Sequence, residues 1–180
     1  MNTFFLDASA LSKRYSGESG HWLVDRLFER ATPARLQCAL IGAGEVISAL
    51  VRKKNDGRIP PLVFQQAMTD FTNEVTAAAL FEKIQFSREQ AVASWLLIEK
   101  HSTNATDALV LRLALDTAAK LRPNGHDLVL VASDLRLLRA AKDEGLLTFD
   151  PEQNSQAELD ALIAAEQLLP SSAQGQPGAA

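Results

Sequence analysis

Four carboxylate residues in this chain could together hold a divalent metal ion and so support hydrolysis of a phosphodiester. They come from four separate segments and are Asp7, Glu45, Asp107 and Asp134. Like charges packed together destabilise a protein unless a cation lies between them. Carboxylate oxygens are hard ligands that suit Mg²⁺ or Mn²⁺ better than zinc. Such ions activate water and stabilise in-line attack on phosphate, so the acids point to metal-dependent hydrolysis.

Each acid taken singly has a simpler explanation near a helix end. Asp7 and Asp134 could cap the helices that follow them, and Asp107 lies in a first turn, where negative charge suits the helix dipole. Glu45 is harder to explain in this way, because it lies among apolar residues, where an ionised carboxylate needs a partner. The joint pattern, rather than any one residue, therefore favours a shared site.

Alternating apolar runs and helical patterns must position these acids. We expect strands at five short apolar segments: Thr3–Leu6, Leu36–Leu40, Ile84–Phe86, Asp127–Ala132 and Leu146–Phe149. We expect helices at Ala8–Tyr15, His21–Arg30, Gly44–Lys54, from Pro60 and Pro61 to Phe71, from Ser87 as N-cap to His101, Thr106–Lys120, Asp134–Glu144 and Gln156–Leu168. This order predicts an α/β domain whose central, mostly parallel sheet of four to five strands is flanked by helices.

The strand order also predicts where the acids meet. In parallel sheets, sites form outside the carboxyl ends of the strands. Asp7 directly follows the first expected strand, and Asp134 follows Leu128–Val131 after two small residues, so both should lie at that edge. Asp127 begins its strand and should lie at the opposite edge, which excludes it from the site.

Composition narrows the class of protein and its compartment. The 180 residues are 47% hydrophobic and carry a formal net charge of -4, which predicts one domain with a real core and argues against a nucleic-acid coat protein. Cys38 is the single cysteine and there are three histidines, so no intrachain disulfide can form and a zinc site is not expected. The first residues resemble neither a signal peptide nor a membrane span, so we expect a cytoplasmic protein with no membrane partner.

Four stretches around the acids resemble the PIN-domain ribonucleases of the VapC toxin type. In chain order they are FFLDASALSKRYSGESG, GEVISALVRK, NATDALVLRLAL and LVLVASDLRLLRAAKDEGLLTFDPE, and the resemblance covers about residues 2–152. It implies a PIN-like three-layer fold. It also implies a metal-dependent endoribonuclease, a hydrolase of RNA phosphodiesters in which three to four acids hold Mg²⁺ or Mn²⁺.

The resemblance assigns a role to each acid. Asp7 matches the family's first aspartate, Glu45 its helical glutamate, Asp107 the aspartate of the Asp-Ala-Leu segment and Asp134 the aspartate after the fourth strand. Ser9 matches a small hydroxyl residue often found near the first aspartate. The position two before Asp134 is often threonine or serine in the family but is Ala132 here, with Ser133 beside it. The interval from Asp107 to Asp134 is also longer than usual.

Three further residues could contact RNA: Ser9, Lys13 and Arg52. Arg52 is seven residues after Glu45 and shares its helix face, although a solvated helix end explains it equally well. The same reasoning applies to Lys13. Trp22 and Trp95 stand at helical core positions, so we expect them to be packed inside rather than stacked on bases.

The resemblance further implies the toxin half of a toxin–antitoxin pair, a homodimer held inactive by a small cognate antitoxin. We expect pairing through helices His21–Arg30 and Leu62–Phe71, whose apolar side chains are not obviously needed by the sheet. The alternative is that these helices simply cover the sheet. An arginine from a partner could pair with the acidic cluster and displace the metal.

Two other functions stay open. An aspartyl-phosphate phosphatase would use Asp7 as nucleophile, but that chemistry usually needs a second aspartate two residues on, where this chain has Ser9. A non-catalytic PIN-like binding module would have no need of all four acids. We divide the chain into a PIN-like nuclease domain at 1–152, a C-terminal helix at 153–168 and a disordered tail at 169–180, which is rich in Ser, Gln, Gly, Pro and Ala.

Overall fold

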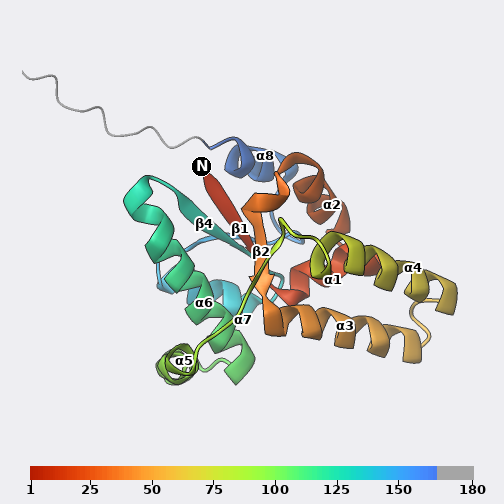
Figure 1. The fold of residues 1–180 in the computed structure, drawn as a ribbon, viewed down its shortest axis with the longest axis horizontal. Coiled ribbons are helices and arrows are strands. Elements are labelled where there is room, and N and C mark those ends of the chain that lie inside the picture. The colour runs from red at the N-terminus through yellow and green to blue at the C-terminus, as the bar shows by residue number, and fades with distance from the viewer. Residues whose placement is uncertain (166–180) are drawn as a thin grey trace, which may run out of the picture.

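A five-stranded parallel sheet in the order β3-β2-β1-β4-β5 runs through the centre of the molecule (Figure 1). Its strands are β1 (Asn2–Leu6), β2 (Leu36–Ala39), β3 (Glu82–Ile84), β4 (Asp127–Val131) and β5 (Leu147–Phe149). The computed structural model describes residues 1–165. The predicted α/β fold with a central sheet is confirmed, and all five strands are parallel.

The strands that precede Asp7 and Asp134 are neighbours in the middle of the sheet. β1 pairs with β4 in register along five residues of each strand. The backbone N–H of Asp7 extends this ladder by donating to the carbonyl oxygen of Val131 at 2.9 Å. Both aspartates therefore leave the sheet at the same edge, while Asp127 begins β4 at the opposite edge, as expected.

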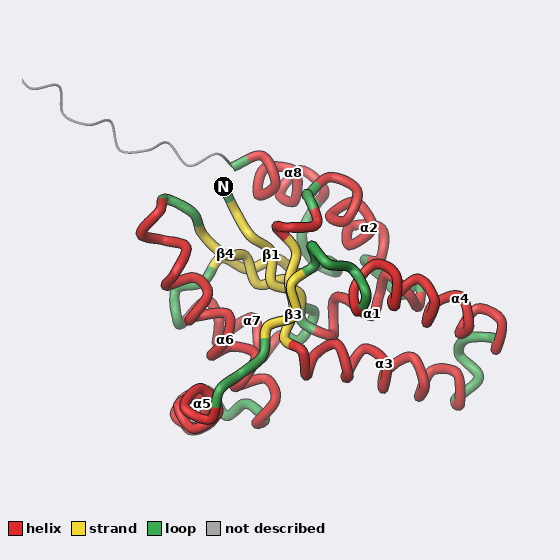
Figure 2. Tube along the Cα trace, viewed as in Figure 1, coloured by secondary structure: helices red, strands yellow, loops and turns green. Residues whose placement is uncertain are grey.

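Helices cover both faces of the sheet and complete three layers (Figure 2). One face is covered by α1 (Ala8–Ser16), α2 (His21–Arg30), α3 (Leu40–Asn55), α4 (Pro61–Phe71) and α8 (Gln156–Ala164). The other is covered by α5 (Arg88–His101), α6 (Ala105–Leu121) and α7 (Leu135–Asp143). Phe4 and Leu6 enter the first core and Phe5 enters the second, which explains why the strands read as unbroken apolar runs.

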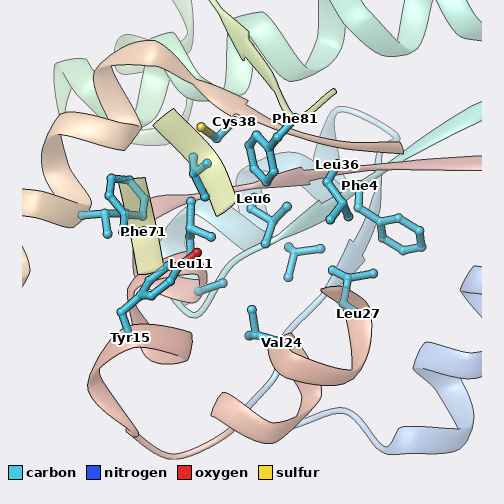
Figure 3. Packing of buried hydrophobic residues seen from close by; sticks show 14 of the residues in the cluster. Phe4, Leu6, Leu11, Tyr15, Val24, Leu27, Leu36, Cys38, Phe71 and Phe81 are labelled. Atoms are coloured by element: carbon cyan, nitrogen blue, oxygen red, sulfur yellow. The ribbon is translucent and has the colours of Figure 1, made fainter. Parts of the chain in front are cut away.

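The core between the sheet and helices α1 to α4 and α8 packs α1 against the sheet (Figure 3). Leu11 and Tyr15 of α1 are buried in the same cluster as Leu6, and the ring of Tyr15 meets that of Phe71 edge to face at 5.2 Å. Burying each large apolar side chain contributes about 1.5–3 kcal/mol relative to leaving it exposed. Asp7, the N-cap of α1, therefore lies at the start of a helix that this core holds against the sheet.

Two elements begin more than one residue away from their expected starts. α3 begins at Leu40, directly after β2, and not at Gly44. An interior glycine costs a helix about 1 kcal/mol, which the burial of Val46 and Leu50 offsets. The third strand is Glu82–Ile84, two residues earlier than expected, because pairing with β2 sets its register rather than its own apolar pattern.

The expectation that both tryptophans lie in the core is wrong. Trp22 is 48% exposed and Trp95 is 62% exposed. The buried face of α2 consists of Leu23, Val24 and Leu27. These three side chains cover the sheet, so the simpler alternative explains them, whereas Trp22 stays exposed.

The C-terminal helix begins as expected. Ser155 caps α8 and forms a reciprocal capping box with Glu158. The described part of the helix ends at Ala164, so the expected continuation to Leu168 and the tail at 169–180 lie outside the described residues. In residues 1–165, no helix has both the length and the apolar character that crossing a membrane requires.

Candidate active site

One cavity at the carboxyl edge of the sheet is lined by all four of the acids singled out from the sequence. Its volume is about 230 Å³. Asp7 comes from the β1–α1 junction, Glu45 from α3, Asp107 from α6 and Asp134 from the β4–α7 connection. The other lining residues are Ala8, Ser9, Ser12, Ala49 and Arg52. Because the four segments are far apart in the sequence, the acids meet only in the folded chain.

Asp7 is the most deeply buried of the four acids, with 6% of the residue exposed. Its Oδ2 accepts hydrogen bonds from the backbone N–H of Ser9 at 2.9 Å and from the Ser9 hydroxyl at 2.5 Å, so it caps α1. Burial raises the pKa of the Asp7 carboxyl above its ordinary value, the bonds from Ser9 oppose this, and the charge of Asp134 adds to the rise. Asp7 therefore caps α1, as its simpler explanation predicts, and it also places a desolvated carboxyl at the cavity.

Glu45 projects from the second turn of α3 and is half-buried. Burial raises the pKa of its carboxyl, and the charges of Asp7 and Asp107 raise it further. Arg52, which lines the same cavity, lowers the pKa of Glu45. The glutamate therefore interacts electrostatically with the acids of two other segments.

Asp107 lies in the first turn of α6 and is also half-buried. Asn104 caps this helix, and its amide Nδ2 donates to Oδ2 of Asp107 at 2.8 Å. Burial raises the pKa of Asp107 to about 6, the charges of Asp7 and Asp134 add to the rise, and the bond from Asn104 opposes it. Its pKa is therefore well above the ordinary value of an aspartate.

Asp134 both caps α7 and lines the cavity. Its Oδ1 accepts hydrogen bonds from the backbone N–H groups of Arg136 at 2.8 Å and Leu137 at 3.1 Å. The exposed guanidinium of Arg136 lowers the pKa of Asp107 and so acts on the cavity, a role that sequence reasoning missed. The available signal was its place two residues after Asp134, in the first turn of the same helix.

The raised pKa of Asp107 predicts that the metal-free protein loses stability as the pH rises. An acid whose pKa is about 6 in the folded state and 3.8 in the unfolded state binds more protons when folded. Its contribution therefore lowers the free energy of unfolding as the pH rises through this window. Asp107→Asn should remove the loss, so its melting temperature relative to wild type should increase between pH 4 and pH 7. Thermal melts in EDTA measure this, and a relative decrease over the same range would contradict it.

The cavity suits an ion that keeps part of its water shell. Within residues 1–165, no group of three or more His, Cys, Asp or Glu side chains is arranged to hold a metal ion directly. Mg²⁺ commonly keeps several waters and is held by one or two carboxylates. A volume of about 230 Å³ has room for several waters at ~30 Å³ each. The all-oxygen donor set and its desolvated acids therefore fit Mg²⁺ or Mn²⁺.

The three residues expected to contact RNA have different surroundings. Arg52 is exposed and lines the cavity, so it stays a candidate. Ser9 also lines the cavity, but its hydroxyl is bonded to Asp7. Lys13 forms an ion pair with Glu152 and only 5% of its side chain is exposed. The expectation that Lys13 contacts RNA is therefore wrong, because its face of α1 turns toward the connection after β5.

Comparison with known proteins bears on the fold. No family model matches the chain, and no curated protein matches it. Among solved structures, the chain is similar to the one described as "Crystal Structure of PAE2754 from Pyrobaculum aerophilum", with a TM-score of 0.58 and 16% sequence identity. The match covers 91% of this chain and 96% of that chain. Similarity at this identity shows a shared fold along nearly the whole length of both proteins.

Proposed function

We propose that this protein is a metal-dependent endoribonuclease that hydrolyses RNA phosphodiesters. The observation that supports it best is the convergence of four carboxylates from separate segments on one cavity. The pKa values of three of them are raised, so a divalent cation would stabilise their charged forms. The resemblance of four stretches of the sequence to VapC-type PIN ribonucleases supports RNA as the substrate.

The polar residues at the cavity have separate roles in this proposal. The four acids would hold Mg²⁺ or Mn²⁺ in part through the waters that the ion keeps, and the bound ion would supply an activated water and stabilise charge on the phosphate. Ser9 keeps one oxygen of Asp7 occupied and so orients its carboxylate. Arg52 and Arg136 are exposed beside the acids and bind phosphates next to the scissile one.

Cleavage of RNA, compared with hydrolysis of a phosphomonoester, tests the proposal. The purified protein with Mn²⁺ or Mg²⁺ should cut RNA internally, should be inactive in EDTA and should leave p-nitrophenyl phosphate intact. Hydrolysis of the phosphomonoester alone would instead indicate an aspartyl-phosphate phosphatase with Asp7 as nucleophile. RNA binding without cleavage would indicate a non-catalytic binding module.

We also propose the biological setting that the sequence resemblance implies. The protein acts in the cytoplasm as the toxin half of a toxin–antitoxin pair, and a small cognate antitoxin holds it inactive. The desolvated acids offer such a partner a place for a basic side chain, since an arginine could make bidentate bonds with Asp7, Glu45 or Asp134 and displace the metal.

We propose a homodimer, but through a surface other than α2. Val92, Trp95 and Leu96 are 46%, 62% and 71% exposed on the outer face of α5. They are spaced three and four residues apart, so they form one apolar stripe along this helix. Leu62 and Val63 form a smaller exposed pair at the start of α4. Tryptophan is enriched among the residues that anchor protein interfaces, and Trp95 stands beside two other exposed apolar side chains, so the α5 stripe is the better candidate.

Light scattering at micromolar concentration tests the dimer. Wild type should show about twice the chain mass of 19.5 kDa. Trp95→Glu should shift the mass toward the monomer, because it places a charge in an apolar interface. Leu62→Glu is the matched control on α4 and should remain dimeric. A wild-type mass of 19.5 kDa would refute the dimer, and dissociation only by Leu62→Glu would place the interface on α4.

A further inference from the structure

A turn at residues 150–154, whose first two residues are buried, contacts a segment that carries one of the cavity aspartates. Its first residue, Asp150, follows β5 and is 6% exposed. Oδ1 of Asp150 accepts hydrogen bonds from the hydroxyl of Ser133 at 3.3 Å and from the backbone N–H of Glu152 at 2.8 Å. Ser133 directly precedes Asp134, so the turn anchors the residue beside this acid.

Ser133 connects the same anchor to the most buried acid. Its backbone N–H donates to Oγ of Ser9 at 2.9 Å, and the Ser9 hydroxyl donates to Oδ2 of Asp7 at 2.5 Å. Because the Ser9 oxygen accepts from Ser133, the hydroxyl hydrogen of Ser9 is directed at the carboxylate. A continuous chain of hydrogen bonds therefore runs from Asp150 to Asp7.

The turn at residues 150–154 also contacts α1 directly. Lys13 lies four residues after Ser9, on the same face of the helix, and pairs with Glu152 although its side chain is 5% exposed. At the end of the α1–α2 loop, a Cβ added to Gly20 would lie 2.3 Å from the carbonyl oxygen of Pro151. This close approach, together with the ion pair, leaves α1 and the turn little freedom to move apart.

We propose that Asp150 is a positioning residue for the candidate active site, acting on Asp7 and Asp134 through Ser133 and Ser9. Asp150 does not line the cavity, so it acts only through these hydrogen bonds. The inference rests on the proposed function, because it treats the cavity as a metal site. Partners outside the ligand sphere commonly orient metal-binding carboxylates and tune metal affinity.

Mn²⁺ binding, measured from the EPR signal of the free ion, tests this role without relying on cleavage. Asp150→Ala removes the acceptor and should weaken Mn²⁺ affinity about tenfold. Asp150→Asn keeps an oxygen that can accept the same two bonds, so its affinity should stay within about threefold of wild type. In RNA cleavage, Asp150→Ala should lower kcat and leave KM nearly unchanged, because the RNA-contacting arginines are untouched.

A matched control and a second variant separate positioning from stability. Asp143→Asn changes an exposed aspartate at the end of α7 and should bind Mn²⁺ like wild type. If Asp150→Ala fails to fold, Ser133→Ala tests the inference in its place. It removes the hydroxyl that donates to Asp150 and should weaken Mn²⁺ binding about threefold to tenfold. Folded Asp150→Ala or Ser133→Ala with wild-type affinity would overturn the inference. Absence of Mn²⁺ binding by wild type would overturn the proposed function and this inference with it.

Discussion

Asp7→Asn is expected to abolish RNA cleavage while leaving the fold intact. The side chain is buried and caps α1, and an asparagine has the same shape and keeps an oxygen that can accept from Ser9. It lacks the negative charge that a divalent cation needs from the deepest acid of the cavity. Loss of an outer partner of a metal site costs ~10–100-fold, so loss of a ligand should cost more than about 100-fold in kcat/KM.

The stability of this variant should move in the opposite direction to its activity. Burial and the charge of Asp134 both raise the pKa of Asp7, so the ionised carboxylate destabilises the metal-free fold at neutral pH. Removing that charge should leave the melting temperature in EDTA equal to or above that of wild type. Loss of activity with a lower melting temperature would instead indicate that the variant is misfolded.

The control for this experiment is Asp143→Asn, which makes the same chemical change at an exposed aspartate that is not part of the cavity lining. Gel analysis of a labelled RNA over a range of enzyme concentrations gives the rates of all three proteins. Asp143→Asn should cut at the wild-type rate. If Asp7→Asn also cuts at that rate, the assignment of the active site is wrong.

Divalent metal is expected to raise the melting temperature of wild type by several degrees. Metal binds the assembled carboxylates of the folded chain and has no such site in the unfolded chain. At a concentration 100 times the dissociation constant, this stabilises the fold by about 2.7 kcal/mol. For a chain of this size, that corresponds to a rise of roughly 5–10 °C.

The double variant Glu45→Gln, Asp107→Asn should lose this response. Both side chains are half-buried at the cavity, and the charge of Asp107 raises the pKa of Glu45, so they contribute to the same negative potential. Differential scanning fluorimetry with Mn²⁺, Mg²⁺ and Na⁺ at equal ionic strength measures the effect. The double variant Glu99→Gln, Asp143→Asn, at two exposed positions, is the matched control and should respond like wild type. An unchanged metal response in the cavity variant would place the ion elsewhere.

The local sequence was sufficient to predict several elements and the four acids. The run Leu128–Val131 is apolar without alternation, which is the pattern of a parallel strand covered on both faces, and β4 occupies it. Ser87 was predicted as an N-cap from its place before a helical pattern, and its hydroxyl does cap α5. The rule that parallel strands end at one edge was enough to group Asp7 with Asp134 and to exclude Asp127.

Other features depend on contacts between segments that are distant in the sequence. A lysine near a helix end reads as exposed, yet Lys13 is buried because Glu152, far along the chain, lies against it. The position of β3 is set by its pairing with β2. The apolar spacing of α2 and α5 does not specify which side of each helix faces the sheet, so the prediction that Trp22 and Trp95 are buried is wrong.

The candidate site also combines properties of the sequence with properties of the tertiary structure. The types of its acids and their positions at strand and helix ends are properties of the sequence. Their shared burial, the raised pKa of Asp107 and the hydrogen bonds from Asp150 through Ser133 and Ser9 to Asp7 are properties of the fold. The physical reason is that desolvation and charge repulsion depend on the separation of groups in space, which sequence distance does not specify.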